Sequence, residues 1–560
     1  MKKFIALILA VLMLSSVIAP ATMAATDESK LPVIYIVGKQ NTPVYKLDDN
    51  GNFLLDENGK KIQVDNVNNP LGMSREEYIK SQIEPVMAEL IPALITGEYS
   101  KYIDTLVDSV APIYAESVLD ANGESKNTAI DWDYSVQQPS KGAGGLKYYY
   151  FRYDWRYSPY ETADLLHQFV EYVCAKEKVD KVNIHARCYG SNVAMAYIAK
   201  SEAGYYDAPF RLNNLALNTT PIAGYIVVGA LMSGSIEFDA ETIDRFVTYY
   251  LSGNDLFDDP MLETMAMVLV SAANQASLLG LGTEVMEKFY AQIGDELIPK
   301  VALVSYGSFP SYWSMIGDTY YDKAKLAVFG TLEAEGEYAG FIEKIDNYHN
   351  MLGRIDEQTG EPLYVQILKR CEEKYGMKTA ILAKYGYATV PLFEGSHITG
   401  DGRGTVTELS LGAMGTLVGE TFTEKQIAEI EAMEDYDARY LSADKKIYAG
   451  TCAFPETTWF SKGLHHADLT QIDPIVTAFF LADGNFTVHS DERYPQFHEY
   501  DNGKFVAIGE EDETNDDWTG NGFAVLVRFI TMILNFFKAL INGEIEAPSF
   551  SEGGLDGIFG

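Results

Sequence analysis

Residues 183–197 read NIHARCYGSNVAMAY, and this stretch decides which kind of fold the chain adopts. It begins as an apolar strand, passes through a tight turn that carries Cys188, and continues from Gly190 as a helix of small residues. Such a turn pushes one side chain outward and turns the next backbone N–H toward a reacting atom. The layout is that of a nucleophile elbow, with Ala186 and Gly190 at its small-residue positions and Cys188 where serine is usual.

The segments around this elbow alternate between strand and helix patterns. Short apolar runs rich in β-branched and aromatic residues predict strands, and amphipathic segments predict helices. This alternation is typical of a mostly parallel sheet with helices on both faces, so the expected fold class is α/β. The expected strands are residues 31–39, 146–155, 181–185, 212–221, 378–386 and 446–450. The expected helices of this body are residues 159–178, 192–201 and 473–484.

Other segments depart from this alternation. Residues 225–360 are dominated by helical patterns, including a long apolar helix at 262–282, and an insertion of this size in an α/β body is typical of a cap or lid. Residues 74–120 also predict helices. Residues 45–64 contain two Asn-Gly turns between short apolar runs, which predicts hairpins.

The N-terminus has the features of an export signal. Two lysines, an apolar run and a small-residue Thr-Met-Ala site occupy residues 1–24, which predicts a cleaved bacterial-type signal peptide. The run is too short and wrongly flanked for a lasting membrane span. We therefore expect the mature protein to be secreted.

The C-terminus changes character after the main body, which is expected to span residues 25–500. Residues 501–522 form an acidic linker, and 523–542 predict a helix whose polar residues share one stripe beneath a wide apolar face. Binding to a membrane surface or to a partner helix, or packing back onto the main body, would each bury that face. Residues 543–560 are expected to be a flexible tail.

The composition excludes several classes of function. The chain carries 43 Lys+Arg against 80 Asp+Glu, a formal net charge of −37, and such a surface repels nucleic acid. Its 4 cysteines are too few for a disulfide scaffold, although a pair such as Cys371–Cys452 stays open. No Cys/His ligand spacing predicts a metal site, and no phosphate-binding or dinucleotide motif predicts a cofactor.

Motifs on both sides of the elbow occur in an order that resembles the lecithin–cholesterol acyltransferase family of α/β-hydrolases. The Tyr-Asp-Trp-Arg tetrapeptide is the most specific of them, and the others support it by their order. The resemblance implies an α/β-hydrolase fold in which residues 225–360 form the lid. The motifs are PVIYIVGK (32–39), YDWR (153–156), the elbow, TTPIAG (219–224), FPS (309–311), GDGRGTV (400–406) and HHADL (465–469).

The resemblance also implies a catalytic triad. Cys188 stands where the family has its serine nucleophile, and His466 fits the family's histidine position. The family places its acid at the second aspartate of an Asp-Gly-Asp turn; here Arg403 occupies that position and Asp401 lies two residues earlier. Cysteine ionises more readily than serine and depends less on a carboxylate, and glycines in the turn allow Asp401 to reach the histidine. Arg187 could lower the pKa of the thiol further.

These residues predict acyl transfer. The backbone N–H groups of Tyr189 and, after the first strand, of Lys39 are expected to form the oxyanion hole. The expected function is a secreted acyl hydrolase or acyltransferase acting on an ester or thioester of an apolar acyl group, lipids included, without a cofactor. The alternative is a catalytically inactive α/β-hydrolase fold that binds a ligand or surface, because both the serine and the usual aspartate are replaced. Asp154 and Arg156 are expected to brace the scaffold as an ion pair.

Overall fold

The computed structural model describes most of the chain between residues 30 and 509. The expected signal peptide, the apolar helix at 262–282, and the linker beyond 509 with the helix and tail that follow it lie outside the described residues. Among the residues that are described, no helix has both the length and the hydropathy of a membrane span. The described residues are 30–39, 42–64, 81, 84–235, 288, 292, 296–389, 395, 397–468 and 470–509.

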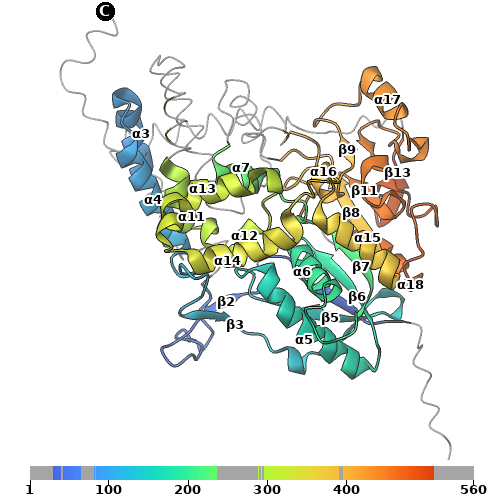
Figure 1. The fold of residues 1–560 in the computed structure, drawn as a ribbon, viewed down its shortest axis with the longest axis horizontal. Helices are drawn as coiled ribbons and strands as arrows, with labels where there is room; N and C mark the ends of the chain where they lie inside the picture. Colours follow the sequence, from blue (N-terminus) through green and yellow to red (C-terminus); the bar gives the residue numbers. More distant parts are fainter. Residues whose placement is uncertain are drawn as a thin grey trace, which may run out of the picture.

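A 9-stranded sheet runs through the centre of the molecule (Figure 1). Its strand order is β13-β12-β11-β8-β7-β6-β1-β5-β4, and every pairing from β12 to β5 is parallel, whereas β13 and β4 join the two edges antiparallel. The expected α/β class is therefore confirmed. The strands are β1 (Val33–Ile36), β4 (Ser140–Lys141), β5 (Lys147–Phe151), β6 (Val182–Arg187), β7 (Leu212–Asn218), β8 (Lys378–Tyr385), β11 (Thr458–Lys462), β12 (Phe497–Asp501) and β13 (Lys504–Ala507).

Alternating side chains of the central strands enter two different cores. In β1, Val33 belongs to one buried cluster and Ile34 to the other, and in β8 Leu382 and Ile381 divide in the same way. Because successive side chains of a strand point to opposite faces, a sheet covered on both sides needs apolar residues at consecutive positions. This requirement explains the continuous apolar runs from which these strands were predicted.

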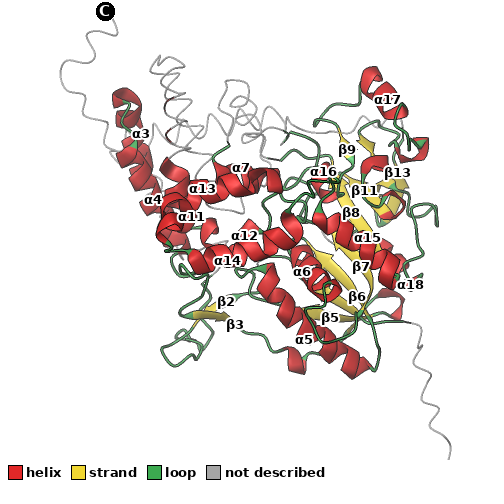
Figure 2. Cartoon of the chain, viewed as in Figure 1, coloured by secondary structure: helices red, strands yellow, loops and turns green. Residues whose placement is uncertain are grey.

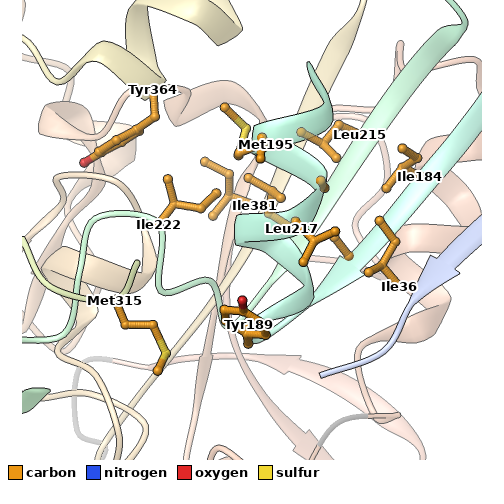
Figure 3. Packing of buried hydrophobic residues seen from close by; sticks show 14 of the residues in the cluster. Ile36, Ile184, Tyr189, Met195, Leu215, Leu217, Ile222, Met315, Tyr364 and Ile381 are labelled. Atoms are coloured by element: carbon orange, nitrogen blue, oxygen red, sulfur yellow. The ribbon is translucent and has the colours of Figure 1, made fainter. Parts of the chain in front are cut away.

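Helices cover both faces of the sheet (Figure 2). Buried side chains of α5, α6 and α15 join the cluster of one face, and those of α18 join the cluster of the other. Figure 3 shows the cluster on the face covered by α6, where Met195 of α6 lies close to Ile381 of β8, and Ile36 and Ile184 of β1 and β6 lie on the other side of the helix. The helices are α5 (Pro159–Glu177), α6 (Gly190–Glu202), α15 (Leu363–Tyr375) and α18 (Asp473–Leu481).

A helical segment separates β7 from α15 in the sequence. Figure 1 shows these helices gathered at one end of the sheet, beside α4. The backbone N–H of Tyr225 donates to the carbonyl of Met315 at 2.8 Å, which ties the start of this segment to its later part. Its described helices are α7 (Ile226–Ser233), α11 (Ile298–Leu303), the 3-10 helix η5 (Tyr306–Ser308), α12 (Pro310–Trp313), α13 (Asp318–Glu335), α14 (Ala339–Tyr348) and the π-helix η6 (His349–Gly353).

The N-terminal third contains the expected hairpins and helices. Gly51 and Gly59 adopt positive φ in two turns, closed by the Leu47–Phe53 and Leu55–Lys61 bridges. The additional elements here are β2 (Val44–Lys46), paired with β3 (Thr128–Ile130), and the helices α3 (Glu84–Thr96) and α4 (Ser100–Tyr114).

Three expectations need correction. Residues 446–450 do not continue the central sheet; they contribute β10 (Ile447–Tyr448) to a separate 2-stranded sheet with β9 (Met414–Gly415), and β11 takes the place beside β8. The sheet continues through β12 and β13, so the first residues of the range 501–522 are strand rather than linker. All four cysteines are free, so Cys371 and Cys452 form no disulfide.

Candidate active site

The elbow lies where β6 ends and α6 begins. Cys188 has a φ of 48°, in the left-handed region that a residue with a Cβ rarely adopts. Its N–H donates to the carbonyl of Asn218 at 2.9 Å, and its own carbonyl accepts the N–H of Ser191 at 2.9 Å. The neighbouring strand and the first turn of the helix therefore hold the strained turn in place, as a nucleophile elbow requires.

Gly190 lets the helix start against the end of β1. A Cβ at this position would lie 2.6 Å from the carbonyl oxygen of Val37 and 2.7 Å from that of Ile36. No side chain fits in that space, so the sequence has glycine at this point of the elbow. The close approach also brings the N-terminus of α6 next to the turn after β1, which carries Lys39.

The other two predicted residues follow β8 and β11. Nδ1 of His466 lies 2.7 Å from Oδ2 of Asp401, and the His466 side chain also hydrogen-bonds to the Cys188 thiol. The Asp401 side chain is fully buried, whereas 14% of the His466 side chain is exposed. The structure therefore brings Cys188, His466 and Asp401 together at the carboxyl ends of three parallel strands, where α/β folds commonly place their sites.

The conformation of the turn after β8 places the Asp401 side chain, rather than that of Arg403, next to the imidazole of His466. Oδ1 of Asp401 accepts the backbone N–H groups of Arg403 at 2.9 Å and Gly404 at 3.0 Å, while Oδ2 faces the histidine. Gly402 makes the reversal possible with a φ of 88°. Arg403 thus contributes its backbone N–H to the site, and the carboxylate comes from the residue two positions before it.

The charges of the three groups depend on one another. Burial opposes ionisation of Cys188, yet the charge and hydrogen bond of His466 outweigh it and hold the pKa of the thiol below its ordinary value. Burial likewise opposes protonation of His466, but Asp401 and Cys188 raise its pKa to about 9. Despite burial, the same contacts lower the pKa of Asp401 to about 2. Each group therefore favours the charged form of the other, a thiolate beside an imidazolium.

The remaining cysteines behave oppositely. Burial raises the pKa of Cys174 to about 11, that of Cys371 to about 12 and that of Cys452 to about 11, and all three side chains are buried. Cys188 alone among the four is partly exposed. It is therefore the thiol with the greatest expected reactivity.

The two residues expected to form the oxyanion hole both belong to segments that meet at the elbow. The N–H of Tyr189 interacts with Cys188, and the Tyr189 ring is buried with its hydroxyl donating to the carbonyl of Tyr157 at 2.9 Å. Lys39 lies in the turn after β1, with its ammonium 3.9 Å from the centroid of the Tyr312 ring and 4.6 Å from that of Tyr306. This cation–π contact fixes the turn against the helical segment; the use of its N–H as an oxyanion donor stays a prediction.

Two further expectations have different outcomes. The Arg187 guanidinium donates to the hydroxyl of Tyr35 at 2.7 Å, and the lowered pKa of the Cys188 thiol comes from His466 and the Tyr189 N–H instead. The ion pair between Asp154 and Arg156 is confirmed, with Nη2 2.6 Å from Oδ2 and the Arg156 side chain fully buried. Arg156 also donates to the carbonyl of Ser117 at 3.0 Å, so the pair braces the scaffold.

Sequence reasoning missed two residues that shape the site. The ring of Tyr225 lies 6.5 Å from that of His466, centroid to centroid, and occupies the space that a side chain at Gly404 would need. Glu408 accepts the N–H of Thr405 at 2.6 Å and that of Ile226 at 2.5 Å, which joins the acid turn to the first residue of α7. Thr405-x-x-Glu408 is a capping-box pattern, so the contact between Glu408 and Thr405 had a signal in the sequence, whereas the contact with Ile226 had none.

Metal binding receives no support from the part of the chain that the structure describes. It contains no group of three or more His, Cys, Asp or Glu side chains arranged to hold a metal ion. The adjacent His465 lies with its ring 5.4 Å from that of Tyr387, centroid to centroid, while His466 faces Asp401.

Comparison with known proteins adds little to this geometry. No protein-family model and no curated protein matches the chain. Among solved structures it is similar to a chain described as "The crystal structure of Tle4-Tli4 complex", with 14% identity over 36% of this chain and 48% of the other, and a TM-score of 0.18. The match spans about half the length of that chain, and a TM-score this low carries no conclusion about fold or activity.

Proposed function

We propose that the chain is an α/β-hydrolase that transfers acyl groups through Cys188, His466 and Asp401. The observation that carries the proposal is the continuous contact from thiol to imidazole to buried carboxylate, with 2.7 Å between Nδ1 and Oδ2. The connectivity supports it, since the thiol follows β6, the carboxylate follows β8 and the histidine follows β11, in a sheet ordered β5-β1-β6-β7-β8-β11. This is the chain order nucleophile, acid, histidine that α/β-hydrolases share.

In the first half of the proposed reaction the thiolate of Cys188 attacks the carbonyl carbon of an ester or thioester. The carbonyl electron pair moves onto oxygen, where the N–H groups of Tyr189 and Lys39 stabilise it. Collapse of this intermediate breaks the bond to the leaving alcohol or thiol, which takes the proton of His466. The acyl group is then bound to Cys188 as a thioester, and His466 is neutral.

In the second half, His466 removes a proton from water or from an acceptor alcohol that attacks the thioester. The second collapse releases a carboxylic acid or a new ester and returns the thiolate with its imidazolium partner. Asp401 stays ionised throughout, because its pKa of about 2 lies far below neutral pH, and it holds Nδ1 of the ring. Every step uses groups of this chain, so the reaction needs no cofactor.

An apolar acyl group is the substrate class that the surroundings favour. Ile222 and Met315 are buried beside Tyr189 in the region between the elbow and the helical segment (Figure 3). We infer that this helical segment, tied to the acid turn through Glu408, acts as the lid over the acyl chain. The substrates to screen are therefore esters, thioesters and lipids that carry an apolar acyl group.

The first test of the proposal is alkylation of the folded protein with iodoacetamide as a function of pH. We expect Cys188 to react fastest of the four cysteines, with an apparent pKa below the ordinary value near 8.5, so the rate falls only when the pH drops through that lower value. In a His466→Ala variant the ion-pair partner is gone, and the advantage of Cys188 at pH 7 should disappear. Peptide mass spectrometry identifies the labelled residue.

A second test separates an enzyme from an inactive binding protein of the same fold. Cys188→Ala should abolish hydrolysis of p-nitrophenyl and thioester substrates, by roughly 10³-fold or more, without changing thermal stability appreciably. Cys174→Ala is the matched control, because that thiol is buried in α5. Slow and equal labelling of all four cysteines, with no turnover of any acyl ester, would establish the inactive alternative.

A further inference from the structure

Lys384, near the end of β8, is buried in the interior of the protein, where lysine is rarely found. Lys384 is fully buried, in the run AILAKY that otherwise supplies apolar side chains to both cores. Its side chain leaves the strand on the same face as Leu382, the face covered by α18. A buried ammonium is unfavourable unless hydrogen bonds replace its water, so its partners carry information.

The partners of Lys384 are backbone carbonyls of the loop that carries the histidine. Its Nζ donates to the carbonyl of Asp468 at 2.7 Å, that of His465 at 3.0 Å and that of His466 at 3.4 Å. An ammonium has three N–H donors, so the number of donors matches the number of acceptors. Lys384 therefore connects the central sheet directly to the residues on both sides of the imidazole.

Other contacts of this loop run elsewhere. The N–H of His466 donates to the carbonyl of Asp401 at 2.8 Å, which links the loop to the acid turn, and the N–H of His465 donates to the Asp468 side chain at 2.8 Å, which closes the loop on itself. The start of the loop also meets β8, where the N–H of Gly463 donates to the carbonyl of Tyr385 at 2.9 Å. Lys384 makes the contacts that reach from β8 to the residues around the histidine itself.

We propose that Lys384 is a positioning residue for the reaction: its ammonium fixes the loop that carries His466 and keeps the imidazole in line between Cys188 and Asp401. The inference rests on the proposed function, because positioning matters only if Cys188 and His466 react. Lys384 touches no substrate and no reacting atom. It acts through the backbone of the histidine loop, as supporting residues of preorganised sites do.

The charge of Lys384 acts in the same direction as its hydrogen bonds. The charges of Asp401 and Asp468 on the two loops and of Cys188 at the elbow favour the ammonium form of Lys384, whereas Arg187 of β6 opposes it. A cation in this place stabilises the carboxylate and the thiolate that the reaction needs. Burial lowers the pKa of Lys384 to about 8, so the third donor is present at neutral pH and is lost as the pH rises through that value.

The test compares Lys384→Met, which keeps the stem but has no donor and no charge, with Lys384→Gln, which keeps two N–H donors. In Lys384→Met the pH profile of Cys188 alkylation should move to higher pH, by about one unit, and the rate at pH 7 should fall accordingly. The kcat for an acyl ester should fall with little change in KM, and Lys384→Gln should lie between Lys384→Met and the wild type. Lys200→Met is the matched control, because Lys200 is also buried but lies in the last turn of α6 and pairs with Asp164 of α5.

The outcomes separate the two proposals. A wild-type Cys188 that is no more reactive than the other cysteines overturns the proposed function itself. A reactive wild-type Cys188 whose pH profile and kcat are the same in folded Lys384→Met overturns the positioning role alone. If circular dichroism shows that Lys384→Met does not fold, Lys384→Gln decides: a shifted thiol profile supports the role, and an unshifted one refutes it.

Discussion

The turn that carries Cys188 and the turn that carries Asp401 solve the same problem in different ways. The elbow is short and fixed by regular structure on both sides, with β6 ending at Arg187 and α6 beginning at Gly190. Its side chain can point in one direction only, because Cys188 is held at a φ of 48°. The turn after β8 is an irregular loop, and hydrogen bonds between its own backbone and the carboxylate give it its shape.

This difference explains why the residue at the elbow has a fixed place in the sequence, whereas the carboxylate of the acid turn does not. At the elbow only the residue at position 188 is placed to meet His466, so the proposed nucleophile can stand at no other position of the sequence. In the acid turn only the position of the carboxylate in space matters. Residues at 401 or 403 could provide it, and Gly402 and Gly404 let the chain bring Asp401 to the histidine.

Among the variants that leave Cys188 in place, Asp401→Asn has the largest expected effect. The variant removes the charge that helps to raise the pKa of His466, so kcat/KM should fall by roughly 10²-fold. The alkaline limb of the pH–rate profile, near pH 9 in the wild type, should move to lower pH because the imidazolium then loses its proton more easily.

The control for this variant is Asp468→Asn, which alters a carboxylate of the same loop that bonds to the N–H of His465 rather than to the ring. It should move the alkaline limb much less. An Asp401→Asn enzyme with an unchanged limb would show that the carboxylate at 401 does not set the state of the histidine, and the comparison of the two turns would fail.

Gly190→Ala should have the next largest effect, on stability rather than on chemistry. The added methyl would lie 2.6 Å from the carbonyl oxygen of Val37, and the start of α6 cannot move without moving the elbow. Overpacking of this kind lowers the free energy of unfolding by about 1–3 kcal/mol, which guanidinium denaturation measures. Ser191→Ala, which only removes an atom at the next position, is the control. Equal stabilities would mean that the elbow is less tightly packed than the contact implies.

The elbow was predictable from sequence because its determinants are local. An apolar strand, a small-residue helix and Gly190 lie within fifteen residues, and the continuous apolar runs of the parallel strands give the sheet around them. The strand preceding His466 was not predicted, because its determinants are distant in the sequence. Residues 458–462 read TWFSK, and their polar residues Thr458, Ser461 and Lys462 are buried by partners that only tertiary structure supplies.

The acid turn and its support were only partly predictable. Asp401 could be proposed because the glycines beside it are visible in the sequence, but its contact with His466 depends on where β8 and β11 end in space. Lys384 stands out as a charge inside an apolar run, and only the structure shows that its partners are the carbonyls of the histidine loop. Tertiary hydrogen bonds of this kind leave no periodic signal.

Gly402→Ala should have a smaller effect than Gly190→Ala. The residue has a φ of 88°, and a Cβ would lie 2.5 Å from Nε2 of His465, an atom at the end of a side chain that can move away. The main cost then comes from holding alanine at a positive φ, which should lower the free energy of unfolding by roughly 1–2 kcal/mol. Gly204→Ala is the matched control, because its φ is 76° and nothing lies within 4 Å of its Cβ position. A larger loss in Gly402→Ala than in Gly204→Ala measures how much the turn relies on His465 staying in place.

Arg403→Ala should have the smallest effect of the series. The contact that this residue makes with the site is its backbone N–H, 2.9 Å from Oδ1 of Asp401, and alanine keeps that donor. Removing the guanidinium should therefore leave kcat/KM within about twofold and stability within about 0.5 kcal/mol. Steady-state kinetics and denaturation on the same preparation check both values. A strong loss of activity at unchanged stability would show that the arginine side chain acts on the substrate, and the acid turn would then contribute two groups to the reaction rather than one.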